Sequence, residues 1–243
     1  MLSRCSLVPM ERLADVEELL DGTLDDPDVL RGNLVDLRRI NRLLGGVRLS
    51  RLAIDGLTNG ATELSILDVG TGGADIPVAL LADARRRGRG LRVVAIEPRA
   101  EVIAAAIASR PGLDRIAGLA LELADGLALP YADGSFDVAH CSMVVHHFAP
   151  AEAASLLGEM ARVARSGIVV NDLVRSRPAL LWARLMTNLL TRNRYTRNDA
   201  PLSVRRAYTR QEMLGLLAEA GLRPVAQFGD LFGHRYAIAA VRR

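Results

Sequence analysis

The segment from Leu64 to Asp75 constrains the fold of this chain more than any other part of the sequence. Its apolar run, Ser65–Val69, is typical of a buried strand and carries one charge, Asp68. The turn that follows, Gly70-Thr71-Gly72-Gly73, gives the backbone freedom and lets a ligand approach the main chain closely. A proline two residues after Asp75 is typical of the first turn of a helix. The segment therefore predicts a strand, a glycine turn and a helix, the unit with which many α/β folds hold nucleotide cofactors.

The glycine turn alone is compatible with two cofactors. A dinucleotide-binding turn follows the pattern Gly-x-Gly-x-x-Gly and places the pyrophosphate on the helix N-terminus. Here Asp75 stands where that pattern has its third glycine, and a carboxylate would repel a pyrophosphate. An acid suits a cationic ligand, and S-adenosylmethionine carries a sulfonium and an ammonium group. The sequence therefore favours S-adenosylmethionine, and an NAD-dependent oxidoreductase stays open as the alternative.

Three more apolar runs follow in the order expected of a doubly wound sheet. The run at 91–97 ends in Glu97, where an acid can accept hydrogen bonds from a ribose diol. The run at 119–123 is followed by Asp125, whose carboxylate could accept a proton from an adenine amino group. The fourth run, 135–142, leads directly into a pair of histidines.

Together these blocks resemble class I S-adenosylmethionine-dependent methyltransferases, and most of all the small-molecule branch with the ubiquinone and menaquinone biosynthesis methyltransferases. The resemblance rests on LDVGTGGAD, VVAIEP, LADGLALPYADGSFDVAHCSMVVHHF and SGIVVNDLVRS, which keep the family's order over about residues 62–175. The chain departs from the family pattern at Ala74, where the last glycine is expected.

The resemblance implies an α/β fold, a Rossmann-like, doubly wound sheet of seven strands with an antiparallel last strand. A helical extension is expected over residues 1–60. The methyltransferase domain is expected over 61–243, with a helical lid inserted after the fifth strand at about 175–208. At the C-terminus, a helix after Thr209 and two strands at 224–228 and 235–241 are expected to complete the sheet.

The resemblance also implies a cofactor site around the glycine turn. Asp68 and the backbone of the turn would hold the methionine end of the cofactor, Glu97 the ribose and Asp125 the adenine. Simpler roles stay open for these acids, as a loop cap, a strand-end charge and a turn residue. The residues expected to bind S-adenosylmethionine, and S-adenosylhomocysteine as product, are Asp68, Gly70, Thr71, Gly72, Gly73, Glu97, Pro98, Asp125, Gly126 and Ser142.

Histidine is the candidate catalytic base, because a phenol or enol acceptor must lose a proton and histidine titrates near neutral pH. His146 and His147 follow the fourth strand, where this fold places the methyl group. Adjacent residues point in different directions, so we expect only one of them to face the acceptor. The aligned histidines of the resembling family are often structural, and that role stays open for both. His140 lies within the strand and is expected to be a core residue.

Two elements outside the sheet are expected to handle the acceptor. Asp26-Pro27 predicts the start of an amphipathic helix that ends at Gly45-Gly46, and Arg38, Arg39 and Asn41 on it could reach the cofactor's carboxylate.

The second element is the lid, where an amphipathic helix over 178–190 precedes a polar stretch at 191–200. Its apolar residues could instead be core or dimer contacts, and an arginine-rich amphipathic helix can also rest on a membrane surface. The residues expected to bind the acceptor are Met143, His147, Trp182, Met186 and Tyr195.

Composition narrows the class of enzyme. Every basic residue is arginine, which excludes a catalytic lysine, and the net charge of +3 is spread among interspersed acids, which gives no support for nucleic-acid binding. Cys5 and Cys141 are far apart, which predicts no cysteine metal site and favours a reducing, cytoplasmic location. Met1–Met10 lacks the apolar run of a signal peptide, and a helix expected from Glu11 makes Met10 a possible start. The sequence also lacks the Asn/Asp-Pro-Pro-aromatic element of enzymes that methylate nucleic-acid amino groups.

The sequence therefore predicts a metal-independent methyltransferase that acts on a small, fairly apolar acceptor, at the oxygen of a phenol, quinol or polyketide-type compound. Asn171-Asp172 is the place to check for a metal. We expect a monomer or homodimer, no nucleic-acid partner and no stable membrane insertion. Four alternatives stay open. They are a C- or N-methyltransferase, a protein or RNA methyltransferase, an S-adenosylmethionine-binding protein with a non-methyltransfer or regulatory role, and the NAD-dependent enzyme.

Overall fold

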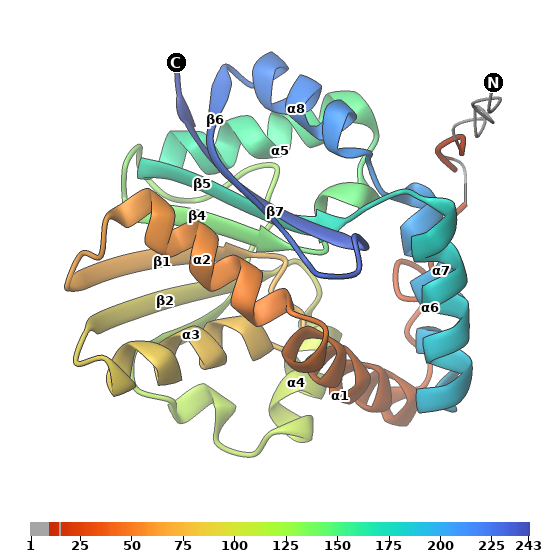
Figure 1. The fold of residues 1–243 in the computed structure, drawn as a ribbon. Coiled ribbons are helices and arrows are strands. Elements are labelled where there is room, and N and C mark those ends of the chain that lie inside the picture. The colour runs from red at the N-terminus through yellow and green to blue at the C-terminus, as the bar shows by residue number, and fades with distance from the viewer. Residues whose placement is uncertain (1–9, 15) are drawn as a thin grey trace, which may run out of the picture.

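A computed structural model describes residues 10–14 and 16–243 of the chain. It places one sheet between layers of helices, with a further pair of helices standing beside the sheet (Figure 1). Cys5 and most of the segment Met1–Met10 lie outside the described residues. None of the helices in the described part of the chain has both the length and the apolar character needed to cross a membrane.

The sheet has the predicted class I arrangement. Its strand order is β3-β2-β1-β4-β5-β7-β6, with β1 to β5 parallel and β7 antiparallel to both of its neighbours. The order reverses between β1 and β4, so the carboxyl ends of these strands open a crevice there. The strands are β1 (Glu63–Val69), β2 (Gly90–Glu97), β3 (Leu119–Leu123), β4 (Phe136–Ser142), β5 (Ala164–Leu173), β6 (Leu222–Gly229) and β7 (Arg235–Arg242).

The helices begin where the sequence supplies caps. Asp26 accepts hydrogen bonds from the backbone N–H groups of Asp28 and Val29, and Pro27 opens α1. Thr209 and Glu212 form a capping box at α8, as the sequence predicts. The helices are α1 (Pro27–Leu43), α2 (Gly46–Thr58), α3 (Asp75–Arg86), α4 (Ala100–Ser109), α5 (Pro150–Val163), α6 (Arg177–Leu190), α7 (Arg194–Arg206) and α8 (Arg210–Glu219).

One local prediction is wrong. The described residues between Glu11 and Leu24 form no helix, because the backbone N–H groups of Leu13, Leu19 and Leu20 donate instead to α7 of the lid.

The polar stretch at 191–200, part of the predicted helical lid, lies largely within α7. Asn193 caps this helix by accepting from the N–H groups of Tyr195 and Thr196. Thr196, Asp199 and Ser203 are buried on the inner face of α7, whereas most of its arginines are exposed.

The lid lies where it is predicted, after β5, and consists of α6 and α7 packed together. Thr196 of α7 donates a 3.0 Å hydrogen bond to Asp36 of α1, and Asn33 of α1 donates a 3.1 Å bond to Thr196. The lid and α1 therefore form a continuous wall beyond the carboxyl ends of β1 and β4. The division of the chain at residue 60 stays a prediction.

Candidate active site

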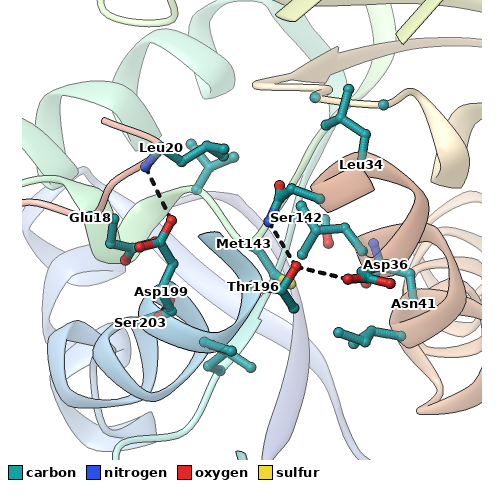
Figure 2. Close-up of a pocket in the computed structure, with 18 of the residues that line it drawn as sticks. Glu18, Leu20, Leu34, Asp36, Asn41, Ser142, Met143, Thr196, Asp199 and Ser203 are labelled. Atoms are coloured by element: carbon teal, nitrogen blue, oxygen red, sulfur yellow. Dashed lines mark hydrogen bonds between the residues drawn. The ribbon is translucent and has the colours of Figure 1, made fainter. Parts of the chain in front are cut away.

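A cavity of about 390 Å³ lies between the carboxyl ends of the central strands and the wall formed by α1, α6 and α7. Figure 2 shows its polar lining, which comes from the N-terminal segment, α1, the end of β4 and α7. Most of the predicted site residues meet here. Those that line the cavity are Asp68, Gly70, Thr71, Gly72, Gly73, Glu97, Pro98, Ser142, Met143, His146, His147, Trp182 and Met186.

The glycine turn shapes one end of the cavity. Gly70 has a φ of +66°, and a Cβ there would lie 2.7 Å from Val144 Cγ2, so both conformation and space require glycine. Gly72 has a φ of +53°, and a Cβ there would meet nothing within 4 Å. The Gly72 N–H donates a 3.1 Å hydrogen bond to Glu97, which ties the turn to the end of β2. The turn thus presents its main chain to open space.

Three carboxylates surround this turn. Asp68, Asp75 and Glu97 all line the cavity, and burial raises the pKa of Asp75 and of Glu97. Asp75 Oδ2 is buried and has no hydrogen-bond partner among the described residues. Such a set suits a ligand with positive charge and hydroxyl donors and repels a pyrophosphate. It therefore fits S-adenosylmethionine and not a dinucleotide.

Asp68 is held by a buried polar chain under the turn. Its Oδ1 lies 2.5 Å from His140 Nδ1, and His140 Nε2 lies 2.8 Å from Ser50 Oγ. Asn171 donates a 2.7 Å hydrogen bond to the same Ser50 oxygen. His140 is buried as expected, but it is a polar link rather than an apolar core residue.

Arg235 was not predicted as a site residue. It connects the buried polar side chains beneath the turn to α1 and β4. Its fully buried guanidinium donates to Asn171 (2.7 Å), Asn41 (2.6 Å) and Ser142 (2.8 Å). Burial lowers the pKa of Arg235 to about 10, although the charge of Asp172 counteracts this. No sequence signal marks an arginine at the start of a strand as a buried anchor. Asn41, expected to reach the cofactor, is thus also a partner of this arginine.

His146 has a defined orientation. Its Nδ1 lies 2.7 Å from Asp172 Oδ1, and both side chains are buried. Burial alone would raise the pKa of Asp172, but the charge and hydrogen bond of His146 outweigh it and lower that pKa. When the ring is neutral with its proton on Nδ1, that N–H donates to Asp172 and Nε2 is free to accept. Nε2 is buried and has no hydrogen-bond partner among the described residues.

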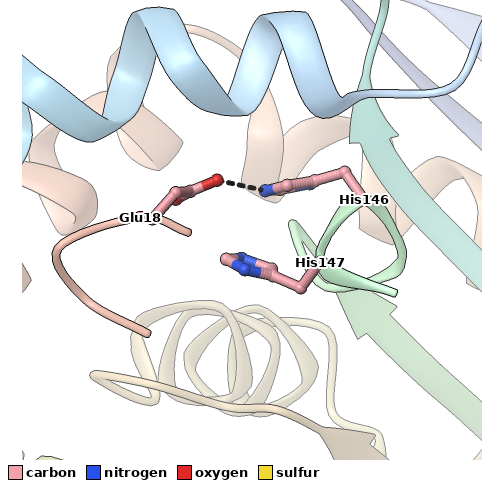
Figure 3. A group of neighbouring side chains, drawn as sticks. All are labelled: Glu18, His146 and His147. Carbon is pink, nitrogen blue, oxygen red and sulfur yellow. Dashed lines mark ion pairs between the residues drawn. The ribbon is translucent and has the colours of Figure 1, made fainter. Parts of the chain in front are cut away.

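Glu18 is the second residue that was not predicted. Its Oε1 lies 3.6 Å from His146 Nε2 (Figure 3). The same oxygen lies 3.6 Å from a guanidinium nitrogen of Arg206. Oε1 has no hydrogen-bond partner in the described part of the chain, and burial raises the pKa of Glu18 to about 7. A glutamate in a segment without periodic pattern gives no sequence signal, because only the fold brings it to the cavity.

The N-terminal segment that carries Glu18 is fixed across the cavity. The N–H groups of Leu19 and Leu20 donate to Asp199 of α7 at 2.8 and 3.1 Å, and Figure 2 shows the second bond. Asp21 accepts a 2.6 Å bond from Arg206 and lies 2.9 Å from His147 Nδ1. These contacts hold the segment between the lid and the loop after β4.

One set of side chains has the geometry to hold a cation. Glu18, His146 and His147 each place one ligand atom within 4.8 Å of the others. The positive charge of Arg206, 3.6 Å from Glu18 Oε1, disfavours a metal ion at that place. Asn171 and Asp172, the other candidates for a metal, are engaged by Arg235 and His146.

Four predicted residues lie outside the cavity, and one of them is Arg38 of α1. Asp125 is exposed and accepts a 2.9 Å hydrogen bond from the Leu127 N–H, as a turn residue does. Gly126 is buried, and a Cβ there would lie 2.8 Å from Val69. Tyr195 packs in the apolar cluster below α1, and its hydroxyl lies 3.4 Å from Asp25. Their binding roles stay predictions without support from the cavity.

The central part of the chain matches a known family. Residues 67–170 match the model of a family described as a methyltransferase domain. A comparison with curated protein sequences finds no match.

Solved structures share the fold at low identity. An S-adenosylmethionine-dependent methyltransferase from Aquifex aeolicus is 18% identical with a TM-score of 0.59, covering 88% of this chain and 97% of that one. Human N-acetylserotonin methyltransferase, in complex with S-adenosylmethionine, is 17% identical with a TM-score of 0.65, covering 93% and 59%. The [4+2]-cyclase SpnF is 14% identical with a TM-score of 0.57, covering 81% and 80%. At these identities the likeness establishes the fold and leaves the reaction to the site.

Proposed function

The chain contains a methyltransferase domain on the class I, S-adenosylmethionine-dependent fold, and we propose that it methylates a small, fairly apolar acceptor. The acceptor atom in this proposal is the oxygen of a phenol, a quinol or a polyketide-type compound. The observation that carries the proposal is the Asp172–His146 pair, which presents a buried, unpartnered Nε2 to the cavity.

The glycine-turn end of the cavity is the proposed cofactor site. Asp68 and the backbone of the turn would hold the amino-acid end, and Glu97 would accept hydrogen bonds from the ribose hydroxyls. When bound, S-adenosylmethionine supplies a methyl group whose leaving group is a neutral thioether. The protein's task is then to position the acceptor, to remove its proton and to exclude water.

His146 is the proposed general base. The proton of the acceptor hydroxyl passes to Nε2, while Asp172 holds the proton on Nδ1, and the oxygen that loses the proton becomes the nucleophile. The imidazolium that results has a carboxylate on each side, because Glu18 Oε1 lies 3.6 Å from Nε2. Glu18 thus acts through His146 and stabilises its charged form.

The far end of the cavity supports the proposal of an apolar acceptor. Met143 follows β4, and Trp182, Ala183 and Met186 contribute apolar side chains from α6. Methionine adapts to ligands of different shape, and aromatic side chains provide large flat contacts. Such a wall excludes water from the acceptor oxygen and favours a planar, weakly polar molecule.

A panel of phenols and quinols, incubated with trideuteromethyl S-adenosylmethionine, tests this proposal by mass spectrometry. We expect label on oxygen with wild-type protein and about 10²–10⁴-fold slower transfer with His146→Ala. Label on carbon or nitrogen would assign a different acceptor atom. Tight cofactor binding with no transfer to any acceptor would support the alternative, a binding protein or an enzyme of other chemistry.

A further inference from the structure

Helix α6 is apolar on two faces, and the protein covers only one of them. Its inner face contributes Trp182 and Met186 to the cavity. On the outer face, Leu181, Leu185 and Leu189 are 69%, 48% and 68% exposed. Because these leucines are four residues apart, they form one stripe along the helix, which we call the outer α6 stripe. A contiguous exposed apolar stripe on a surface helix indicates a binding surface.

The segment that carries this stripe is rich in positive charge, although Arg194 in it pairs with Asp25. Residues 177–206 contain seven arginines and one carboxylate, Asp199, in a chain whose net charge is only +3. Asp199 is buried and accepts hydrogen bonds from the N-terminal segment, so its negative charge does not lie on the outer surface. The exposed arginines of this segment are Arg177, Arg184, Arg192, Arg194, Arg197 and Arg205.

The mouth of the cavity lies beside the same surface. Leu190, at the end of α6, and Leu43, at the end of α1, both line the cavity and are 64% and 75% exposed. Arg39 of α1 also lines the cavity, and its side chain is largely exposed. The rim of the mouth therefore has the same character as the outer α6 stripe, apolar with arginine beside it.

We propose that the outer α6 stripe docks on an anionic phospholipid surface, with the mouth of the cavity next to the bilayer. Leucines would enter the interface between headgroups and acyl chains, and the arginines would contact anionic headgroups. At fourteen residues α6 is too short to cross a bilayer and would lie in its plane. The docking does not depend on the reaction, although an acceptor dissolved in the bilayer would reach the cavity directly.

Charge favours a bilayer over other partners. A second copy bound through the same stripe by two-fold symmetry would bring the arginines around that stripe close to their own equivalents. A nucleic acid would pair with the arginines but leave the three leucines in water. An anionic bilayer satisfies the apolar and the charged groups together.

Flotation of the full-length protein with large unilamellar vesicles tests the proposal. We expect the protein to float with vesicles of phosphatidylcholine and phosphatidylglycerol and to remain unbound with pure phosphatidylcholine. Binding should fall in high salt, because surface electrostatics are screened. Trp182 is the only tryptophan and lies on the inner face of α6. A Leu185→Trp substitution on the outer α6 stripe, in a Trp182→Phe background, should therefore be quenched by vesicles with brominated acyl chains. Quenching assigns the contact to this helix.

Two variants separate the apolar contribution to vesicle binding from the electrostatic one. The triple change Leu181→Ser, Leu185→Ser and Leu189→Ser should abolish flotation, and Arg184→Gln with Arg192→Gln should weaken binding by at least about tenfold. Val225→Ser on β6 is the matched control, since Val225 is also an exposed aliphatic residue, and it should bind like wild type. Circular dichroism checks that each variant is folded, and all are assayed for methyl transfer with a water-soluble acceptor, which should not change.

Three results would overturn the proposal. The first is failure of the wild-type protein to float with anionic vesicles, and the second is binding of the triple variant that equals that of wild type. The third is a wild-type protein that is dimeric by light scattering and becomes monomeric with the triple change. The last would assign the stripe to a second copy. Because transfer to a soluble acceptor is measured separately, failure of docking is distinguishable from failure of the proposed reaction.

Discussion

The two ends of the cavity are built in different ways. At the cofactor end, Asp68, the glycine turn and Asp75 lie within eight consecutive residues, and Glu97 follows one helix later. At the acceptor end, Glu18, His146 and Asp172 come from three separate segments, although Glu18 and Asp172 both face the same imidazole ring.

This difference explains what each end can tolerate. The cofactor end is set by a local backbone shape, in which Gly70 is confined by Val144 and by its positive φ. The acceptor end is set by long-range contacts, such as those of Asp199 with Leu19 and Leu20. We therefore expect substitutions at the two ends to affect different quantities, cofactor affinity at one and transfer rate at the other.

The largest effect is expected at the acceptor end. His146→Ala should lower kcat by about 10²–10⁴-fold, because it removes the group that accepts the proton. The affinity for S-adenosylmethionine should stay unchanged, since His146 belongs to the other end of the cavity. Steady-state kinetics and calorimetry measure the two quantities. His147→Ala is the matched comparison, and a larger loss of kcat there would make His147 the base.

The next effect tests the link between the two ends. Arg235→Met should destabilise the fold by about 3–5 kcal/mol, because it leaves the buried acceptors of Asn171, Asn41 and Ser142 without their donor. Urea unfolding followed by circular dichroism measures this. Arg223→Met, at an exposed arginine of β6, is the control and should cost little. Equal losses of unfolding free energy in Arg235→Met and Arg223→Met would show that the buried hydrogen bonds of Arg235 do not link the two ends of the cavity.

Glu18 gives a pH-dependent test of the acceptor end. Burial raises its pKa from 4.5 to about 7 in the folded protein, so the native state holds this proton more tightly than the unfolded chain does. Stability contributed by the protonated form is therefore lost as pH rises from about 4.5 to 7. Glu18→Gln removes this loss, so its stability relative to wild type should rise between pH 5 and pH 8 by roughly 1–3 kcal/mol. Urea unfolding of both proteins at pH 5 and pH 8 measures this change. If the midpoints of Glu18→Gln and wild type differed by the same amount at the two pH values, the result would contradict a buried, protonatable Glu18.

A smaller effect sharpens the account of the cofactor end. Glu97→Ala should weaken S-adenosylmethionine binding by about 1–3 kcal/mol through the lost ribose hydrogen bonds. Glu101→Ala, at an exposed acid on the helix that follows β2, should leave the affinity unchanged. Calorimetry gives both values. An affinity that is indifferent to Glu97 would limit this residue to its bond with the Gly72 N–H.

The same contrast accounts for what the sequence could predict. The seven-stranded sheet, the glycine turn and the place of the lid follow from short periodic runs and turn residues, which act locally. The helix expected from Glu11 was wrong, because tertiary hydrogen bonds decide the conformation of that segment. Local pattern could not anticipate that Thr196 and Asp199 of α7 would bond to α1 and to the N-terminal segment.

The site residues divide along the same line. Asp68, Glu97 and the histidine pair were found because they directly follow or end apolar runs. Glu18 and Arg235 were missed because their roles depend on partners that are distant in the sequence, such as His146 for Glu18 and Asn41 for Arg235. Asp125 and Tyr195 look like site residues in sequence, yet one closes an exposed turn and the other packs under α1.

The most direct test of the account is calorimetric titration with S-adenosylmethionine, S-adenosylhomocysteine and NADH. Asp68→Asn is the variant of choice, because it keeps a group that can bond to His140 while it removes the negative charge. We predict binding of both adenosyl ligands to the wild-type protein, none of NADH, and about 10- to 100-fold weaker binding to Asp68→Asn. Binding of NADH alone, or affinity for the adenosyl ligands that is unchanged in Asp68→Asn, would contradict the assignment of the glycine turn as the cofactor site.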